Sequence, residues 1–375
     1  MRRGELAVAL GGLLLSGLLV GACAGSGVPT SREPSESAAP SAPHAPTPSA
    51  SPTASASPSA PPTAEPTPTP SPTRQVAPGE TAWVDVAVAT GWRNPQAVRD
   101  VDVPALEDPV RVRDWLAAMS EDDIGGLIGA ADSQLLLGEP VEVVDVQGSW
   151  AQVVVPDQPS PLDLRGYPLW IPMVQLTAAP PPGSDEVATV IVPTAWLRSA
   201  DGTPAMEVSF GTHLPVLGRE ASGVKVALPD GSPMWIELEA VAVAAPGTSP
   251  LPATPAAVVA SARAFIGLPY LWAGTSGFGF DCSGLVHRVY EAHGVLLPRD
   301  AGPQATVGIA VERQELEPAD LVFFARDGAV HHVAIYVGDG QVLEAPYIGA
   351  TVRVMELSAL PYAAEYAGAR RVVGQ

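Results

Sequence analysis

The sequence has few cysteines and few basic residues. Only two cysteines, Cys23 and Cys282, occur in 375 residues, so at most one disulfide can form, and a zinc ribbon or a cysteine-rich scaffold is excluded. Lys+Arg total 20 against 40 Asp+Glu, which gives a formal net charge of −20. Nucleic acid and other polyanions are therefore poor partners, and we expect no nucleic-acid binding. We also expect no metal and no cofactor. The 46% hydrophobic content nevertheless requires a folded core, and the length allows two or three domains.

A long apolar run lies at the N-terminus. The chain starts with Met1-Arg2-Arg3, continues with apolar and small residues from Leu6 to Val20, and then reads Val20-Gly21-Ala22-Cys23. The run is shorter than the roughly 20 residues that a membrane-spanning helix needs. It predicts an export signal over residues 1–22, and it resembles the bacterial lipoprotein cleavage box, in which Cys23 becomes the acylated first residue. The alternative is an uncleaved membrane anchor with an incidental cysteine.

Residues 23–78 are rich in Pro, Ser, Ala and Thr and contain almost no large apolar side chain. Such a composition forms no core and favours an extended, polyproline-rich spacer. We expect the spacer to hold the folded part of the chain away from the lipid bilayer to which acylated Cys23 binds. The protein would then be extracytoplasmic and lipid-anchored to the bacterial cell membrane. A mucin-like glycosylated stalk is the alternative interpretation of residues 23–78.

Short strands are predicted in two consecutive blocks, with a helical pattern at residues 112–119 inside the first. The strands of the first block are expected at residues 135–137, 141–144, 150–155 and 167–172, and those of the second at 195–197, 211–217, 224–231 and 234–236. Short strands separated by glycine-rich and proline-rich turns are typical of small barrels. The blocks resemble two tandem bacterial SH3-like domains, at residues 79–180, with a helical insertion, and at residues 185–245.

The last block, residues 252–375, has a cysteine at the start of a predicted helix. Apolar residues recur with helical spacing at Leu285, Val286, Val289 and Tyr290, and the pattern stops at Gly294. Asp281 precedes Cys282 and is a good helix N-cap. Unpaired N–H groups and the helix dipole at this end favour the thiolate, which is the attacking species. We therefore interpret Cys282 as a nucleophile, and a buried structural cysteine is the alternative.

Two histidines, His287 and His293, fall on the same predicted helix. His287 lies outside the apolar stripe, and His293 lies near the C-terminal end of the helix. We expect both at the helix surface or at its cap rather than in the chemistry.

A nucleophilic cysteine needs a base, and the candidates are the adjacent His331 and His332. They begin an apolar run that is followed by the turn signal 338–340 and by a second strand at 341–345. In such a hairpin His332 and Glu344 share one face, opposite or diagonal to each other. Cys282, His332 and Glu344 then form a plausible triad of nucleophile, base and orienting carboxylate. The residue pattern alone leaves the choice between His331 and His332 open.

Five motifs in the last block occur together in the NlpC/P60 cell-wall cysteine peptidases. They lie at residues 269–274, 280–284, 297–299, 318–324 and 332–338. The block therefore resembles this family, and the resemblance implies a papain-like α+β fold. It also implies that Cys282 is the nucleophile and His332 the base, with Glu344 at the third polar position. Tyr270 would lie beside the nucleophile and support the oxyanion together with backbone N–H groups.

Tandem SH3-like domains before such a block resemble the γ-D-glutamyl-L-diamino acid endopeptidases. The resemblance implies that peptidoglycan stem peptides or muropeptides are the substrates. It further implies that Asp281 and Ser283 hold the free amine of an N-terminal L-Ala, and that the first SH3-like domain closes the site on one side. The alternatives are a lytic hydrolase of intact peptidoglycan, a wall-binding protein with weakened catalysis, and a related cysteine enzyme that cuts other amide or ester bonds.

Three positions depart from the family pattern. Ala273 and Ala319 replace glycines, which costs little unless the backbone there needs a positive φ. Glu344 stands where the family more often has histidine or another neutral polar residue. A carboxylate at that position should favour the imidazolium form of the base, whereas a surface glutamate in a weakened enzyme is the alternative.

Overall fold

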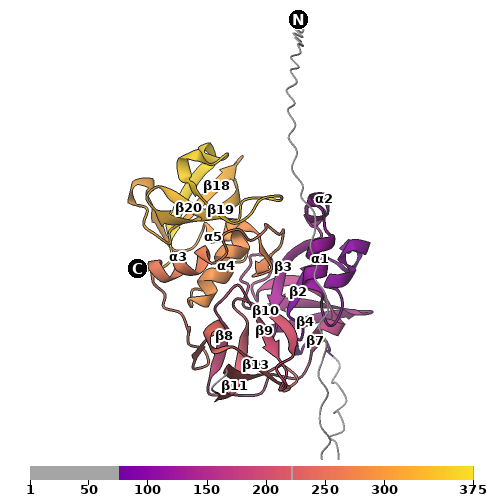
Figure 1. Cartoon of the computed structure of the whole chain (residues 1–375). Coiled ribbons are helices and arrows are strands. Elements are labelled where there is room, and N and C mark those ends of the chain that lie inside the picture. The colour runs from indigo at the N-terminus through magenta and orange to yellow at the C-terminus, as the bar shows by residue number, and fades with distance from the viewer. Residues whose placement is uncertain (1–75, 221–222, 375) are drawn as a thin grey trace, which may run out of the picture. The chain divides into compact units, whose positions relative to one another are not determined.

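The computed structural model describes residues 76–220 and 223–374 (Figure 1). The predicted signal peptide, Cys23 and nearly all of the predicted spacer lie outside the described residues. Within the described ranges, no helix is long and apolar enough to cross a membrane.

The first β-domain is a seven-stranded antiparallel sheet with the order β3-β2-β6-β5-β4-β1-β7. Its strands are β1 (Thr81–Val84), β2 (Val88–Trp92), β3 (Ala131–Leu136), β4 (Pro140–Gln147), β5 (Trp150–Val155), β6 (Tyr167–Pro172) and β7 (Leu176–Thr177), with the 3-10 helix η3 (Met173–Gln175) before β7. Alternate residues of β5, such as Ala151, Val153 and Val155, enter one apolar core. The strands β3 to β6 overlap the segments predicted from the sequence, with Leu137 just beyond the end of β3, whereas β1, β2 and β7 were not predicted.

A helical insertion separates β2 from β3. It contains η1 (Pro95–Ala97), η2 (Asp100–Ala105), α1 (Val112–Ala118) and α2 (Glu121–Gly125), and α1 lies where the sequence shows its helical pattern. Trp115 of α1 is buried, and its Nε1 donates to Oδ1 of the buried Asp102 at 3.0 Å. The apolar cluster around Trp115 includes Leu271 and Ala273 of the last block. The insertion therefore packs against the segment that leads to the candidate nucleophile.

The second β-domain has the order β10-β9-β13-β12-β11-β8-β14, which is the same order as in the first domain with every number raised by seven. Its elements are β8 (Val187–Val190), β9 (Thr194–Arg198), β10 (Pro204–Ser209), β11 (His213–Glu220), β12 (Gly223–Ala227), β13 (Pro233–Ile236), η4 (Leu238–Ala240) and β14 (Val241–Ala244). Its own core includes Val190, Leu197 and Val224. The repeated sequence pattern therefore corresponds to a repeated topology.

The C-terminal domain combines helices with a six-stranded antiparallel sheet of order β17-β22-β18-β19-β20-β21. Its helices are α3 (Pro255–Arg263), α4 (Cys282–Ala292), α5 (Ala301–Gln304), η5 (Arg313–Glu315), η6 (Leu357–Ala359) and η7 (Ala363–Glu365). Its strands are β15 (Thr275–Ser276), β16 (Gly279–Phe280), β17 (Ile309–Val311), β18 (Leu321–Arg326), β19 (Ala329–Gly338), β20 (Gln341–Glu344), β21 (Arg353–Glu356) and β22 (Tyr366–Arg371). Together with the two β-domains, this arrangement confirms the predicted α+β class.

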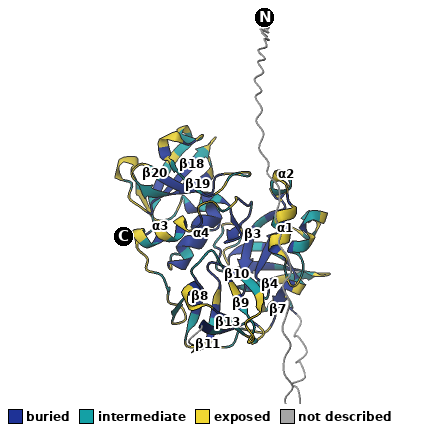
Figure 2. Ribbon diagram, in the orientation of Figure 1, coloured by how far each residue is buried: buried dark blue, intermediate teal, exposed yellow. Residues whose placement is uncertain are grey.

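Helix α4 is buried along almost its whole length (Figure 2). Its apolar residues, among them Leu285 and Val289, pack in one core with Phe323 and Val333 of the sheet. Its polar side is buried too, because Arg288 donates from Nη1 to both Glu139 of the first β-domain and Glu291 at 2.6 Å. The helix is therefore fixed by the sheet on one side and by a β-domain on another.

Candidate active site

Cys282 is the first residue of α4, and Asp281 is its N-cap. Oδ1 of Asp281 accepts a hydrogen bond from the Gly284 N–H at 2.7 Å, which satisfies one of the free N–H groups of the first turn. A Cβ on Gly284 would lie 2.0 Å from the Gly274 carbonyl oxygen, so only glycine permits the loop to pack this closely on the helix start. Cys282 itself is partly exposed. The structure thus presents one accessible thiol at the end of a rigid, buried helix.

The sheet brings His332 to this thiol. Ile335 of β19 pairs with Leu343 of β20, so His332 and Glu344 lie diagonally on one face of the hairpin. Nε2 of His332 lies 2.9 Å from Oε2 of Glu344, and the imidazole lies near enough to Cys282 for that residue to raise its pKa.

The electrostatics of the pair favour a charged imidazole. Burial lowers the pKa of His332, but the hydrogen bonds to Cys282 and Glu344 outweigh it and raise that pKa to about 9. Burial raises the pKa of Glu344, but the hydrogen bonds from His332, Tyr362 and Arg353 outweigh it and hold that pKa below its ordinary value. Both groups therefore carry charge at neutral pH.

Glu344 is not a surface residue, because only 1% of it is exposed. Nε of Arg353, its cross-strand neighbour on β21, donates to Oε1 of Glu344 at 3.0 Å. The hydroxyl of Tyr362 donates to the other carboxylate oxygen and lies 3.1 Å from Nε2 of His332. Sequence reasoning missed Arg353 and Tyr362. The strand register could have indicated Arg353, whereas Tyr362 lies in an irregular segment that carries no such signal.

His331 points away from the thiol and is half-exposed. Its Nε2 lies 2.7 Å from Oε2 of Glu365. The strand pairing shifts register next to His331, between Phe324 and Ala325 of β18. The geometry thus brings His332, and not its neighbour, to Cys282.

The expectation of a position at the helix surface or cap was wrong for His287, whereas His293 does cap α4. Both are buried, because α3 and the β-domains pack where the sequence pattern left a solvent-exposed side. Nδ1 of His287 lies 2.8 Å from the Leu297 carbonyl oxygen, and burial lowers the pKa of His287 to about 3, which keeps it neutral. His293 is the C-cap of α4, as expected, and its Nδ1 lies 2.7 Å from the Pro252 carbonyl oxygen.

Tyr270 is buried next to Cys282. Desolvation, followed by the electrostatic effect of the neighbouring Cys282, raises the pKa of Tyr270 well above its ordinary value. The phenol therefore keeps its proton and can donate a hydrogen bond. Its backbone N–H donates to the Ala350 carbonyl, which fixes the segment before the nucleophile.

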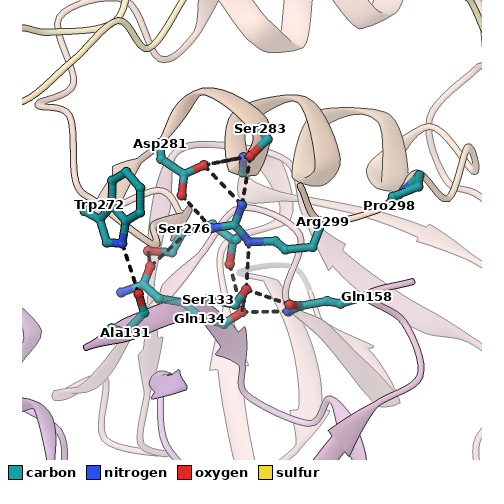
Figure 3. A network of polar contacts seen from close by, with 12 residues as sticks. Ala131, Ser133, Gln134, Gln158, Trp272, Ser276, Asp281, Ser283, Pro298 and Arg299 are labelled. Carbon is teal, nitrogen blue, oxygen red and sulfur yellow. Dashed lines mark hydrogen bonds and ion pairs between the residues drawn. The ribbon is translucent and has the colours of Figure 1, made fainter. Parts of the chain in front are cut away.

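Asp281 and Ser283, which flank Cys282 in the chain, both contact the buried Arg299 (Figure 3). Arg299 donates from Nη2 to Oδ2 of Asp281 at 2.5 Å, and from Nη1 to Oδ1 of Asp281 and to Oγ of Ser283 at 3.1 Å each. Asp281 is therefore already paired with a cation. Sequence reasoning gave Arg299 no role, although the residue belongs to the quoted motif at 297–299.

The first β-domain contacts the same side of the site. Nε of Arg299 donates to Oγ of Ser133 on β3 at 2.8 Å, and Nε1 of Trp272 donates to the Ala131 carbonyl at 3.0 Å (Figure 3). Thr275 of β15 donates from Oγ1 to the Gln134 carbonyl at 2.9 Å. No residue of this domain could be assigned to the site from the sequence. Through these contacts, Ser133 and Gln134 of the first β-domain bind Arg299 and Thr275 of the C-terminal domain.

The chain is similar to known proteins in both its C-terminal domain and its second β-domain. The profile of the NlpC/P60 family matches residues 267–371, and that of the YKFC SH3b2 domain matches residues 190–243. The γ-D-glutamyl-L-lysine dipeptidyl-peptidase of Bacillus cereus (strain ATCC 10987 / NRS 248) is 40% identical over 301 residues, which cover 77% of this chain and 90% of that protein.

The chain belongs to the NlpC/P60 family.

Two further relatives support this placement of the NlpC/P60 protein. The γ-D-glutamyl-L-lysine dipeptidyl-peptidase of Bacillus subtilis (strain 168) is 38% identical over 290 residues, or 76% of this chain and 96% of that protein. The crystal structure of an NlpC/P60 family protein from Bacillus cereus ATCC 10987 matches with a TM-score of 0.75 at 38% identity, covering 79% of this chain and all of that one (100%). The similarity thus includes the β-domains as well as the NlpC/P60 domain.

The two alanines that depart from the family pattern both have left-handed backbones. Ala273 has φ 63° and Ala319 has φ 69°. Glycine adopts this conformation freely, whereas an L-residue with a Cβ is strained there by roughly 1–2 kcal/mol. The backbone at these positions therefore does need a positive φ, and each alanine is held there by its buried surroundings.

Proposed function

We propose that this NlpC/P60 protein is a cysteine endopeptidase that hydrolyses the γ-D-glutamyl-L-diamino acid bond of peptidoglycan stem peptides whose N-terminal L-Ala is free. One arrangement carries the proposal: the partly exposed Cys282 at the start of α4 lies near enough to His332 to raise the pKa of its imidazole, and His332 is paired with the buried Glu344. The named activity of the two Bacillus relatives supports the choice of bond.

The proposed reaction has two halves. The Cys282 thiolate attacks the γ-carbonyl carbon of D-Glu, and the backbone N–H groups at the helix start together with Tyr270 stabilise the oxyanion. His332 then gives its proton to the departing amine of the diamino acid, which leaves a thioester on Cys282. Neutral His332 takes a proton from water, the hydroxide attacks the thioester, and the thiolate leaves with L-Ala-D-Glu as the released product. Glu344 orients the imidazole and stabilises its charged form throughout.

Substrate recognition is proposed to depend on Asp281 and Ser283, on the other side of Cys282 from His332. A dipeptidyl-peptidase, the activity named for the relatives, removes two residues from a free N-terminus. Asp281 and Ser283 would accept hydrogen bonds from the ammonium group of L-Ala. The first β-domain packs against this side, where its Ser133 accepts a hydrogen bond from Arg299 and its Ala131 carbonyl accepts one from Trp272. This packing would leave little room for a glycan strand attached to L-Ala.

Mass spectrometry of the products tests the proposed function. L-Ala-γ-D-Glu-L-Lys and its diaminopimelate counterpart should each give L-Ala-D-Glu and the free remainder, and Cys282→Ala should give neither. Cleavage at another bond, or release of soluble fragments from intact peptidoglycan at a comparable rate, would contradict the proposal.

We further propose that residues 1–22 are a lipoprotein signal peptide, that acylated Cys23 anchors the protein in the membrane, and that residues 23–78 form the spacer. Metabolic labelling with a fatty-acid probe should tag the wild-type chain and not Cys23→Ser. Equal labelling of the wild-type and Cys23→Ser chains would contradict a lipid anchor at Cys23.

A further inference from the structure

Arg299 connects the first β-domain to the start of the nucleophile helix. Its side chain is 1% exposed, and its donors bind in two opposite directions: Nε donates to Ser133, while Nη1 and Nη2 donate to Asp281 and Ser283 (Figure 3). A guanidinium is a rigid plane with its donors in fixed positions. Fixing Nε therefore also fixes the direction in which Nη1 and Nη2 point.

The Ser133 end of this connection is rigid. Oγ of Ser133 donates to Oε1 of Gln158 at 2.6 Å, and Nε2 of Gln158 donates to the Gln134 carbonyl at 2.8 Å. The hydroxyl hydrogen of Ser133 is thus committed to Gln158, and a lone pair is presented to Nε of Arg299. The Arg299 N–H also donates to the Pro159 carbonyl, so the backbone is held by the same domain.

The other end is where the proposed substrate amine binds. Oδ1 of Asp281 already accepts hydrogen bonds from Gly284, Ser283 and Arg299, whereas Oδ2 accepts one from Arg299. A carboxylate oxygen has two lone pairs, so Oδ2 retains one for an ammonium group. Because Arg299 neutralises the charge of Asp281, recognition of the amine depends on where this lone pair points more than on net charge.

We propose that Ser133 and Arg299 are positioning residues for substrate recognition: Ser133 of the first β-domain fixes Arg299, and Arg299 fixes the Asp281 and Ser283 oxygens that receive the free amine of the substrate. This inference rests on the proposed function and adds a specific role for the first β-domain. It concerns binding of the amine and leaves the chemistry of Cys282 and His332 unaffected.

Ser133→Ala tests the connection, with Ser209→Ala as its matched control. Ser209 is a buried serine of the second β-domain that accepts a hydrogen bond from the Gly277 N–H at 2.8 Å, so it also joins a β-domain to the C-terminal domain but does not contact Arg299. For the free tripeptide, Ser133→Ala should raise KM about tenfold and change kcat less than about twofold. It should also reduce the preference for free over N-acetylated substrate by about the same factor. Ser209→Ala should change neither quantity.

Two further measurements test whether the effect is confined to amine binding and whether it involves Arg299. The rate at which iodoacetamide alkylates Cys282 should be the same in Ser133→Ala as in the wild type, because the His332 side is untouched. Arg299→Lys keeps the positive charge but loses the planar fork, so it should raise KM and reduce the amine preference in the same direction. It provides the test if Ser133→Ala does not fold.

Unchanged KM and unchanged amine preference in the folded variants would overturn the inference. Equal effects of Ser133→Ala and Ser209→Ala would also overturn it, since they would indicate a general loss of domain packing. A wild-type protein that releases no L-Ala-D-Glu would instead refute the proposed function, so the two failures are distinguishable.

Discussion

The two sides of Cys282 are built in different ways. On one side, His332, Glu344 and Arg353 come from three consecutive strands of one sheet. On the other side, Asp281 is held by Arg299, which in turn binds Ser133 from a point 166 residues earlier in the chain. Under the proposed function, the chemistry is local to the NlpC/P60 domain, whereas recognition of the substrate depends on how that domain packs against the first β-domain.

The largest effect on turnover is expected from replacing Cys282, which lies between the two sides. Cys282→Ala should reduce turnover to background, a loss of at least about 10³-fold, because no other group can form the thioester. Both sides remain intact in this variant, so it should still bind the tripeptide in a calorimetric titration. Turnover above background would refute the cysteine-peptidase mechanism.

Replacing each histidine in turn tests which of the two is the base. His332→Ala should lower kcat/KM about 10²- to 10⁴-fold, whereas His331→Ala, whose side chain contacts Glu365 instead, should retain wild-type activity. The alkylation rate of Cys282 as a function of pH should change in His332→Ala alone. A change confined to His331→Ala would mean that the other histidine is the base.

Glu344→Gln tests the carboxylate, with Glu365→Gln beside His331 as the control. Burial lowers the pKa of His332, but Cys282 and Glu344 raise it from 6.5 to about 9. The stability that the imidazolium contributes is thus complete below 6.5 and is lost as the pH rises through about 9. Without the carboxylate this loss should begin at lower pH, and kcat/KM near neutral pH should fall about tenfold.

Urea midpoints and kcat/KM measured from about pH 6 to about pH 10 check this prediction. Coincident profiles for Glu344→Gln and the wild type would show that the carboxylate does not support the base.

The smallest effect is expected at the strained alanines. Ala319→Gly removes the cost of a Cβ at φ 69° but also a buried methyl group, so we expect a gain in the free energy of unfolding of at most about 1 kcal/mol. Ala319→Val, which adds a β-branched side chain to the same backbone, should be clearly destabilising. Chemical denaturation measures the free energy of unfolding of both variants. A valine variant as stable as the wild type would contradict backbone strain at residue 319.

The same contrast explains what the sequence could predict. The His332 side was predictable because a tight turn at 338–340 and the two-residue period of a strand place Glu344 near His332. The Arg299 side was not, because its contact with Ser133 joins two domains across 166 residues of sequence and no local pattern indicates it. The burial of His287 was missed for the same reason: periodicity shows which side of a helix is apolar, and it does not show that a partner such as Glu139 will bury the polar side as well.

The central claim is that one side of Cys282 cuts the bond while the other side selects a free amine. The most direct test is the ratio of kcat/KM for L-Ala-γ-D-Glu-L-Lys to that for its N-acetylated form, measured with the wild-type protein. Acetylation removes the ammonium group that Asp281 and Ser283 would bind, so the ratio should be at least about 10, which corresponds to one lost charge-assisted hydrogen bond. Equal values for the two peptides would contradict the account and would make the protein a peptidase without selection for a free N-terminus.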